Sequence, residues 1–418
     1  MIPILLKKAI RSRLVCTPHA GSGSHPALCQ AASPVKFIPL MGILLAVFSG
    51  FSLFAQQKDT LKIKRDTVIS DYSTYKRSIT FAGLLQTRYV ASLTSNVDVN
   101  GANFNAASAS KIDNNFLLKR ARFFVIGKVN DHFSANFMVD FAEFDGNPTS
   151  RVLDNAYIKY TLSKHFMIQA GQFRPFFGIE DAIPNEIIRT LDYSNQYYAF
   201  GSSGWQSFQE GVTILGTITN EGQMPVRYYV GAYNGNNKNI ATDDDNTKNF
   251  YARLEFDPAK KVTIGINGAS GSLGEGTGYA WGGDIQATFD LSKAWQLTLN
   301  GEFKSGTNFA LFNTYTVKPS LSQVMMHGYY VFPIIRYNYD RKRVRAIEFS
   351  SRYEYFNANY KLNSNPEQTI IPNVTMVFAD DFYAALQLGV SIDMYQKDIP
   401  LTTTYTHNLA YIQFQVRF

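Results

Sequence analysis

Arginine residues on the polar faces of short alternating segments are the side chains of this sequence best suited to binding chemistry. A guanidinium group stays charged, and its planar fork donates paired hydrogen bonds to phosphate and carboxylate groups. These basic residues are Arg88, Arg120, Arg122, Arg253, Arg336 and Arg352. Acidic residues occupy equivalent positions: Asp140, Glu255, Asp284, Glu302, Glu348, Glu354 and Asp393. The pattern fits either an arginine ladder for anions or a mixed-charge surface whose charges pair with one another.

Other reactive groups are sparse or badly spaced. Four histidines lie beyond residue 55, and their wide spacing fits no metal-ligand pattern; they are His132, His165, His327 and His407. The glycine-rich stretch 271–278 lacks the strand-to-helix context of a nucleotide loop. Residues 243–246, "DDDN", lack the spaced ligands of a calcium loop. We therefore predict no catalytic residue, no cofactor and no metal site.

Composition favours a strand-rich chain and argues against nucleic acid as a partner. Only 17% of the 418 residues are charged, against roughly 25% in average soluble domains, and 14% are aromatic. The formal charge of +7 is uneven, because residues 1–55 carry five basic and no acidic residues. Residues 56–418 keep 35 basic and 33 acidic residues, a net charge of +2, so a general basic patch is not supported.

The first 55 residues predict a removable leader. Lys36 precedes the apolar run "FIPLMGILLAVFSGFSLF", and small residues offer a cleavage point after Ala55, which is typical of a secretory signal peptide over residues 36–55. A membrane-anchor helix is the rival interpretation of this run. Both cysteines, Cys16 and Cys29, lie in this leader, so the exported body would contain no disulfide. Residues 56–77 are polar and unpatterned, and we expect them to form a short periplasmic tail.

About sixteen segments of the body alternate between apolar and polar residues, as strands with one apolar and one polar face do. They lie near 78–91, 115–128, 132–143, 151–161, 164–174, 206–219, 225–234, 248–257, 261–270, 278–290, 294–305, 324–339, 345–356, 369–379, 382–394 and 405–418. The gaps between them alternate between short turns and long loops. This rhythm is typical of an outer-membrane β-barrel with short periplasmic turns and long external loops.

The final segment, "LAYIQFQVRF", fits the closing strand of such a barrel. Its apolar series ends on Phe418, and in lipid the last strand must pair with the first to satisfy its backbone groups. A terminal aromatic strand is similar to the recognition signal for the barrel assembly machinery. The sequence thus predicts an all-β transmembrane antiparallel barrel over residues 78–418, located in the bacterial outer membrane among its lipids.

Residues 115–215 resemble the phosphate-selective porin O and P family. The resemblance rests on the segment around Lys119–Arg122, on "DNAYIKY", and on "GQFRPFFGIE" at Gly171–Glu180. Fainter likeness covers residues 324–356, including "GYYV", and the terminus. The resemblance implies a sixteen-stranded water-filled porin, homotrimers, and a third external loop, here residues 175–205, folded inward as a constriction.

The expected constriction loop carries more acidic than basic charge. Its charged residues and the arginine just before it are Arg174, Glu180, Asp181, Glu186, Arg189 and Asp192. It also contains apolar residues suited to packing on the inner wall: Phe176, Phe177, Ile179, Ile183 and Ile187. Because rings of charge set which ions pass, the loop favours cations, whereas the resemblance implies anions such as phosphate. Both interpretations stay open.

The function that fits best is a passive porin, not an enzyme, for small hydrophilic solutes or ions. Two alternatives remain. An outer-membrane barrel enzyme of the phospholipase kind would need a His and a Ser on the lipid-facing side of neighbouring strands. An exported soluble β-rich binding protein would bury its apolar faces in one core.

Overall fold

The computed structural model describes residues 77–418 apart from a few short segments. Those segments are 108–111, 145–146, 148, 150, 184–187, 241–242, 244–245, 273–275, 340, 342 and 380–382. The predicted leader, residues 1–55, and residues 56–76 of the predicted tail lie outside the described residues. No helix within the described part of the chain is long and apolar enough to cross a lipid bilayer.

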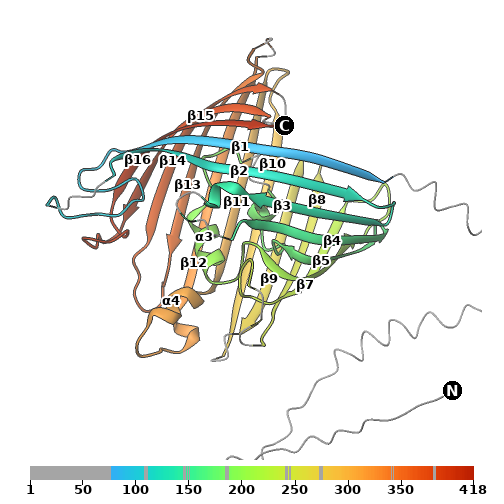
Figure 1. Ribbon diagram of the computed structural model, residues 1–418, viewed down its shortest axis with the longest axis horizontal. Coiled ribbons are helices and arrows are strands. Elements are labelled where there is room, and N and C mark those ends of the chain that lie inside the picture. The colour runs from blue at the N-terminus through green and yellow to red at the C-terminus, as the bar shows by residue number, and fades with distance from the viewer. Residues whose placement is uncertain are drawn as a thin grey trace, which may run out of the picture. The chain divides into compact units, whose positions relative to one another are not determined.

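The described residues form sixteen antiparallel strands that close into one barrel, which confirms the predicted fold class (Figure 1). The strands are β1 (Ser78–Ser92), β2 (Asn114–Lys128), β3 (Phe133–Asp140), β4 (Leu153–Ser163), β5 (Phe166–Phe173), β6 (Gln209–Thr217), β7 (Val226–Tyr233), β8 (Asn249–Ala259), β9 (Val262–Ser272), β10 (Thr277–Asp290), β11 (Trp295–Thr307), β12 (Met325–Asn338), β13 (Ala346–Asn357), β14 (Glu367–Ala379), β15 (Ala384–Tyr395) and β16 (His407–Arg417). Each strand pairs with its neighbours in the sequence, and β1 pairs with β16.

Short turns lie at one rim and most of the long loops at the other, as the gap lengths predict. One exception is the connection between β9 and β10, which shrinks to residues 273–276 because both strands extend further than expected. The long loops contain η2 (Phe141–Phe144), α2 (Ile179–Ala182), α3 (Asn195–Ser202), α4 (Phe309–Thr314) and η4 (Leu321–Gln323). In outer-membrane barrels the rim with the short turns is the periplasmic one, and we name the two rims accordingly.

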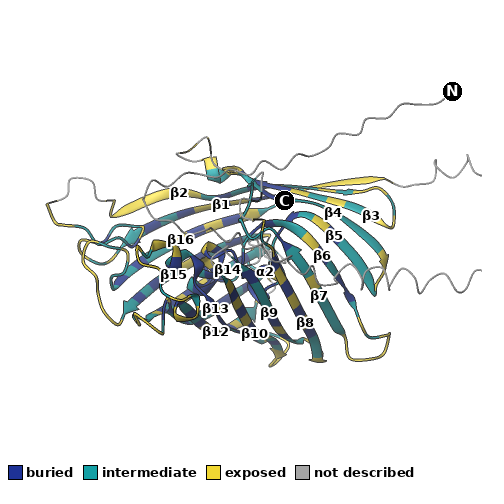
Figure 2. Ribbon diagram, turned by 90° about the horizontal axis from the view of Figure 1, so that it is seen from below, coloured by how far each residue is buried: buried dark blue, intermediate teal, exposed yellow. Residues whose placement is uncertain are grey.

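Side chains alternate between an apolar outer surface and a polar interior, and Figure 2 shows buried and exposed residues alternating along the strands. In β16, Ile412, Phe414 and Val416 are exposed, whereas Gln413 and Gln415 are buried. Apolar residues exposed on other strands include Phe81, Leu85, Phe123, Phe137, Leu254, Ile266, Leu299, Val331, Phe349 and Leu388. An apolar outer surface around a polar interior is typical of a barrel that spans a membrane.

The last residue closes the barrel. The backbone N–H of Gly83 donates to Phe418 O at 2.7 Å, and Phe418 N–H donates to Gly83 O at 3.1 Å. The Phe418 ring covers the bare backbone of Gly83, where an added Cβ would come within 2.2 Å of the ring. Closure in this way leaves no unpaired edge in the membrane.

Two prolines lie in the middle of strands without breaking the barrel, and a third, Pro258, is the residue before the last of β8. Pro372 in β14 keeps its pairing with Ser351 of β13, and Pro333 in β12 keeps its pairing with Leu299 of β11. On its other side each proline falls in a gap of the register, between β14 and β15 or between β12 and β13. Because proline has no backbone donor, a local break on one side is the expected accommodation.

Candidate functional site

The segment between β5 and β6, residues 174–208, folds into the barrel. Figure 1 shows α3, which belongs to this segment, within the ring of strands. Ser194 caps α3, since its hydroxyl accepts from the Tyr197 N–H at 3.3 Å. Serine is a favoured N-cap residue because it satisfies a backbone donor that the helix leaves free.

Apolar side chains hold the base of this loop against the inner wall. Phe177, Phe200 and Trp205 are completely buried in one cluster with wall and loop residues. The cluster's other buried members are Phe173, Tyr233, Tyr251, Ala280, Phe309 and Met326. Each such side chain contributes roughly 1.5–3 kcal/mol when fully buried, so the cluster fixes the base of the loop.

The expected apolar residues of the loop lie against the wall where the structure describes them. Phe176 stacks on Tyr229 at a ring-centroid distance of 4.4 Å. Ile179 packs with Tyr330, Phe332 and Ile334 of β12, and Ile183 borders the same cluster. Ile187 lies outside the described residues.

Residues 189–193, which we call the strap, are held along their backbone by wall side chains. Asn373 donates to Arg189 O at 3.3 Å, and Gln387 donates to Thr190 O at 3.3 Å. Arg88 donates to Leu191 O. Arg352 donates to Asp192 O at 2.7 Å and to Tyr193 O at 3.0 Å. Five consecutive carbonyl groups thus accept from four lumen-facing side chains on β1, β13, β14 and β15.

The strap lies between two cavities of the lumen. The periplasmic cavity, of about 680 Å³, is lined by Arg189 and Thr190 and by wall residues near the short turns, such as Gln296 and Asn338. The external cavity, of about 430 Å³, is lined by Leu191 and Asp192 and by residues near the long loops. Tyr193 and Arg352 line both cavities. A solute that crosses the barrel between the cavities therefore meets the strap.

A family model describes more than half of this chain. The model is that of the phosphate-selective porin O and P, and it matches residues 92–311, from the end of β1 into α4. The chain belongs to the phosphate-selective porin O and P family. Its closed barrel and its family make it a porin, a passive diffusion channel of the bacterial outer membrane. No curated protein matches the sequence at a significant level.

Solved structures with the same fold are outer-membrane channels and proteins. An anion-selective porin from Comamonas acidovorans gives a TM-score of 0.54 at 10% identity, with 82% of this chain and 100% of that chain covered. The outer membrane channel DcaP of Acinetobacter baumannii gives 0.52 at 12% identity, with coverages of 82% and 97%. A loop-deletion variant of OmpT of Vibrio cholerae gives 0.52 at 10% identity, with coverages of 82% and 99%. OmpT is also known in a trimer form, at a TM-score of 0.50. At these identities the likeness establishes the fold.

In this porin the predicted basic residues are engaged with carboxylates or with the loop. Arg122 contacts Asp140 at 2.9 Å, and Arg336 contacts Glu348 at 2.9 Å. The remaining pairs are Arg88 with Asp192 at 3.0 Å, Arg120 with Asp192 at 3.1 Å, Arg253 with Asp284 at 2.6 Å and Arg352 with Glu354 at 2.6 Å. This geometry matches a mixed-charge lumen better than a ladder of arginines open to solutes.

The predicted acidic wall residues also meet the loop. Glu302 accepts from the Ile179 N–H at 3.0 Å and contacts Lys304 at 2.9 Å. Glu348 lies between Arg336 and Arg189, and its Oε1 is 3.0 Å from Nη1 of Arg189. The wall therefore supplies both hydrogen-bond acceptors and countercharges to the loop.

Within the loop, two of the predicted carboxylates are buried and bonded locally. Glu180 accepts from the Ser194 N–H at 2.8 Å, and Asp181 accepts from Gln206 at 2.9 Å. Arg174 donates to the Tyr193 hydroxyl at 2.6 Å rather than to an open lumen. Glu186 lies outside the described residues. Asp181 lines neither cavity and therefore acts on the permeation path less directly than its sequence position suggests, whereas Glu180 borders the periplasmic cavity.

Strand parity alone misses one important cation, Lys119. Gln86 pairs with Arg120 and Thr87 with Leu118, so Lys119 is the additional residue of a β-bulge in β2. The bulge turns Lys119 and Arg120 toward the same carboxylate, that of Asp192. Strict alternation would place the Lys119 ammonium on the lipid-facing surface, where a cation is destabilising. A lysine at such a position is therefore a sequence signal for a β-bulge.

The pKa values of two loop carboxylates, Asp192 and Asp181, shift in opposite directions because their surroundings differ. Burial alone would raise the pKa of Asp192, but Lys119, Arg88 and Arg120 together hold the pKa well below its usual range. Burial raises the pKa of Asp181 to about 6, although Lys304, Arg174 and Gln206 oppose the shift. Asp192 thus stays ionised, whereas Asp181 titrates in a range where the porin can be measured.

Acidification from pH 7 to pH 5 is expected to move the selectivity of the channel toward anions. The pKa of Asp181 rises from its ordinary 3.8 to about 6, so the folded loop prefers the protonated form. Protonation of Asp181 therefore stabilises the folded loop as the pH falls through about 6, and this stabilisation is lost as the pH rises. Protonation also removes one negative charge from the loop, which favours anions. The reversal potential in a salt gradient measures the change. Asp181→Asn should show a smaller pH dependence than the wild type; an equal dependence would contradict the assignment.

Among the described residues, no group of three or more His, Cys, Asp or Glu side chains is arranged to hold a metal ion.

Proposed function

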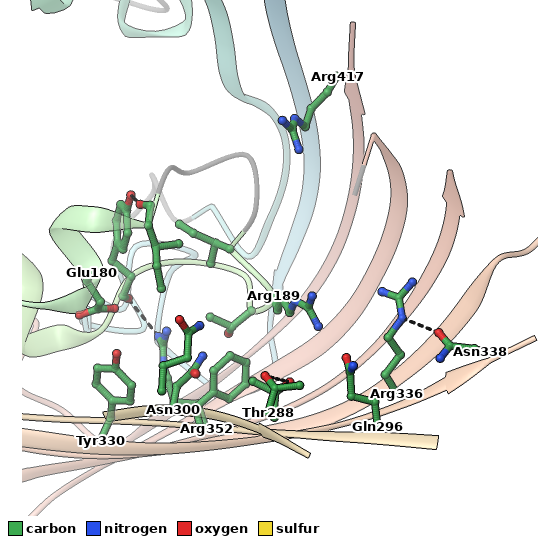
Figure 3. Close-up of a pocket in the computed structure, with 17 residues that line it drawn as sticks. Glu180, Arg189, Thr288, Gln296, Asn300, Tyr330, Arg336, Asn338, Arg352 and Arg417 are labelled. Carbon is green, nitrogen blue, oxygen red and sulfur yellow. Dashed lines mark hydrogen bonds between the residues drawn. The ribbon is translucent and has the colours of Figure 1, made fainter. Parts of the chain in front are cut away.

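We propose that residues 174–208 form the constriction of a diffusion channel for small hydrophilic solutes, with a weak preference for anions. The supporting observation is the charge of the periplasmic cavity. Figure 3 shows Arg189, Arg336 and Arg417 reaching toward the same space from the loop, β12 and the end of β16. Arg352 lines the cavity as well, and Glu180 is the one carboxylate among the described residues that line it.

The preference is weak because neighbouring carboxylates offset these cations. Glu348 lies behind Arg189 and Arg336, and Glu354 contacts Arg352. The remaining wall of the periplasmic cavity is uncharged and rich in amides and hydroxyls, including Gln286, Thr288, Gln296, Thr298 and Asn300. Such a lining suits hydrated ions and small polar solutes, since rings of charge and hydrogen-bonding groups set what passes.

The test is the reversal potential of the purified porin in planar bilayers under a potassium chloride gradient. We expect a small potential of the sign that indicates chloride preference. Arg189→Gln combined with Arg336→Gln should remove it, because Glu348 then faces the cavity without its cations. Arg151→Gln is the control, since it removes a cation from an exposed loop outside the lumen. A strong cation preference of the wild type would overturn the proposal.

A channel is better supported than a barrel enzyme. The four histidines of residues 77–418 make structural contacts: His132 with Thr161 O at 2.7 Å, His165 with Thr217 O at 2.6 Å, His327 stacked on Tyr360 at 4.4 Å, and His407 with Asp393 at 3.2 Å. None of these contacts is a His–Ser pair of the kind that a lipid-facing hydrolase needs.

The proposal also covers the oligomeric state of the porin and its insertion into the membrane. Three copies of this chain are expected to form the functional unit, by analogy with the trimer form of OmpT. Phe418 is the proposed recognition residue for the barrel assembly machinery, because it is exposed at the periplasmic end of the closing strand. Outer-membrane lipids would then cover the apolar surface that the subunits leave free.

A further inference from the structure

The external cavity differs from the neighbouring wall of the lumen in having an apolar floor. On β1, β14 and β16, the buried lumen-facing residues nearer the periplasmic rim are amides, namely Gln86, Asn373 and Gln413. Closer to the long loops the same three strands present aliphatic side chains, which line the cavity of about 430 Å³: Val90, Ile371 and Leu409. A hydrated ion gains nothing from an aliphatic surface, so the floor indicates a solute with an apolar face.

Two tyrosine rings border this cavity, one from the inward loop and one from the wall. Tyr198 of α3 is 46% exposed, and its hydroxyl donates to Asp192 Oδ1 at 2.6 Å. Its ring makes T-shaped contacts with Tyr197 and Tyr193, at centroid distances of 5.7 and 6.4 Å. Tyr395, the last residue of β15, borders the cavity from the wall. The Tyr198 ring is therefore held in one orientation while nearly half of its side chain stays accessible.

Hydrogen-bonding groups from two external loops also line the cavity. Asn100 of the β1–β2 loop and Thr403 of the β15–β16 loop are exposed there. The two loops are tied together, because the Asn103 N–H donates to Thr402 O at 2.9 Å and the Leu401 N–H donates to Asn103 Oδ1 at 3.0 Å. Amide and hydroxyl groups both donate and accept, as a solute rich in hydroxyl groups requires.

Most charged groups of the cavity are already paired within the protein. Arg88 and Lys119 contact Asp192 at 3.0 and 2.8 Å. Asp393 contacts His407 at 3.2 Å and accepts from the Ser391 hydroxyl at 3.0 Å. The lining thus presents paired charges and fixed dipoles, which suit a neutral polar solute.

We propose that the external cavity is a binding site for neutral sugars of the size of a disaccharide or smaller. A sugar ring has an apolar C–H face and a hydroxyl-bearing edge. The face packs on Tyr198 and on the aliphatic floor, and the hydroxyl groups bond to the side chains of the external loops. The volume of about 430 Å³ lies within the range of small-ligand pockets, roughly 300–1,000 Å³. The inference deepens the proposed function by naming a solute class, and it rests on the strap as the boundary of the cavity.

The experiment measures block of the potassium chloride current by maltose added on the side of the long loops. Calorimetry in a detergent without a sugar headgroup measures maltose binding directly. We expect maltose to bind the wild type and to reduce its current. Tyr198→Leu should raise the maltose concentration for half-block about fivefold, the factor that one aromatic contact supplies, and Tyr395→Leu should act in the same direction. Sorbitol, a linear polyol with hydroxyl groups but no ring face, should block far less.

Two further variants separate the ring from its surroundings. Tyr198→Phe keeps the ring and loses only the hydrogen bond to Asp192, so it should bind maltose as the wild type does. Tyr279→Leu is the matched control for the loss of a tyrosine, because Tyr279 is 62% exposed on the outer surface of β10. It should leave both the block and the binding unchanged.

Equal losses of maltose affinity in Tyr198→Leu and Tyr198→Phe would show that the hydrogen bond, and not the ring, matters, which overturns the saccharide site. Block by sorbitol equal to that by maltose, or a wild type that binds no maltose, would overturn it as well. Calorimetric binding without current block would keep the sugar site and reject the strap as the constriction. The two ideas therefore fail separately.

Discussion

Replacing Leu299 with arginine is expected to lower the free energy of unfolding of the barrel by about 2–4 kcal/mol, the cost of a cation on the lipid-facing surface near the bilayer midplane. Leu299 lies in the middle of β11, paired with Ala287 and Pro333, and is 36% exposed on the outer surface. Its neighbours along the strand turn inward, so an arginine here has no polar partner within reach. Urea midpoints of the porin refolded into lipid vesicles measure the loss.

Asn300→Arg provides the control on the opposite face of the same strand. Asn300 is 8% exposed and lines the periplasmic cavity, whose volume of about 680 Å³ gives a longer side chain room. The new cation there faces water and amide groups, so the midpoint should change much less. Equal midpoints for the two variants would contradict the facing of β11, and with it the division between lipid and lumen residues.

Much of the fold could be predicted because the strand period is short and local. Alternation in segments such as Trp295–Thr307 and His407–Arg417 defines two faces without any knowledge of distant residues. Pro372 and Pro333 do not disrupt this, since a barrel tolerates a local gap in one ladder. The closing contact between Gly83 and Phe418 follows from the need to pair every edge in lipid.

The arrangement of the lumen could be predicted only in part. Strand parity assigns Arg88 and Arg120 to the interior, but it cannot reveal a bulge and therefore does not place Lys119 there. The loop's apolar residues indicate that it packs inward, yet their partners on β12 come from a segment more than a hundred residues away. Which carboxylates meet solute depends on such long-range contacts.

The contacts of the strap are the part of the lumen that is hardest to predict from the sequence. Its backbone carbonyls accept from Arg88, Arg352, Asn373 and Gln387, and no local pattern links these residues to positions 189–193. Charge counting treats Glu180, Asp181 and Asp192 as equivalent. The structure separates them, because only Asp192 lies in a cluster of three cations at the external cavity.

Replacing Gly178 with valine is expected to displace the inward loop and to raise the single-channel conductance while the barrel stays folded. Gly178 has φ +121° and ψ 174°, a backbone region that is essentially restricted to glycine and costs other residues about 1–3 kcal/mol. A Cβ at this position would lie 1.9 Å from Glu302 Oε1 and 2.8 Å from Lys304 Nζ. Those two side chains are almost completely buried and paired with each other, so they have little freedom to yield.

The displacement should affect the pore and spare the wall, because Gly178 belongs to the loop and to no strand ladder. Gly222→Val is the matched control: Gly222 also has a positive φ, +82°, but nothing lies within 4 Å of its added Cβ in the turn between β6 and β7. The Gly222→Val variant should also carry backbone strain, but it should leave the conductance at the wild-type level. Heat-modifiable migration on gels confirms that both barrels are folded. A folded Gly178→Val porin with unchanged conductance would show that residues 174–208 do not limit the current, and the constriction would have to lie elsewhere along the lumen.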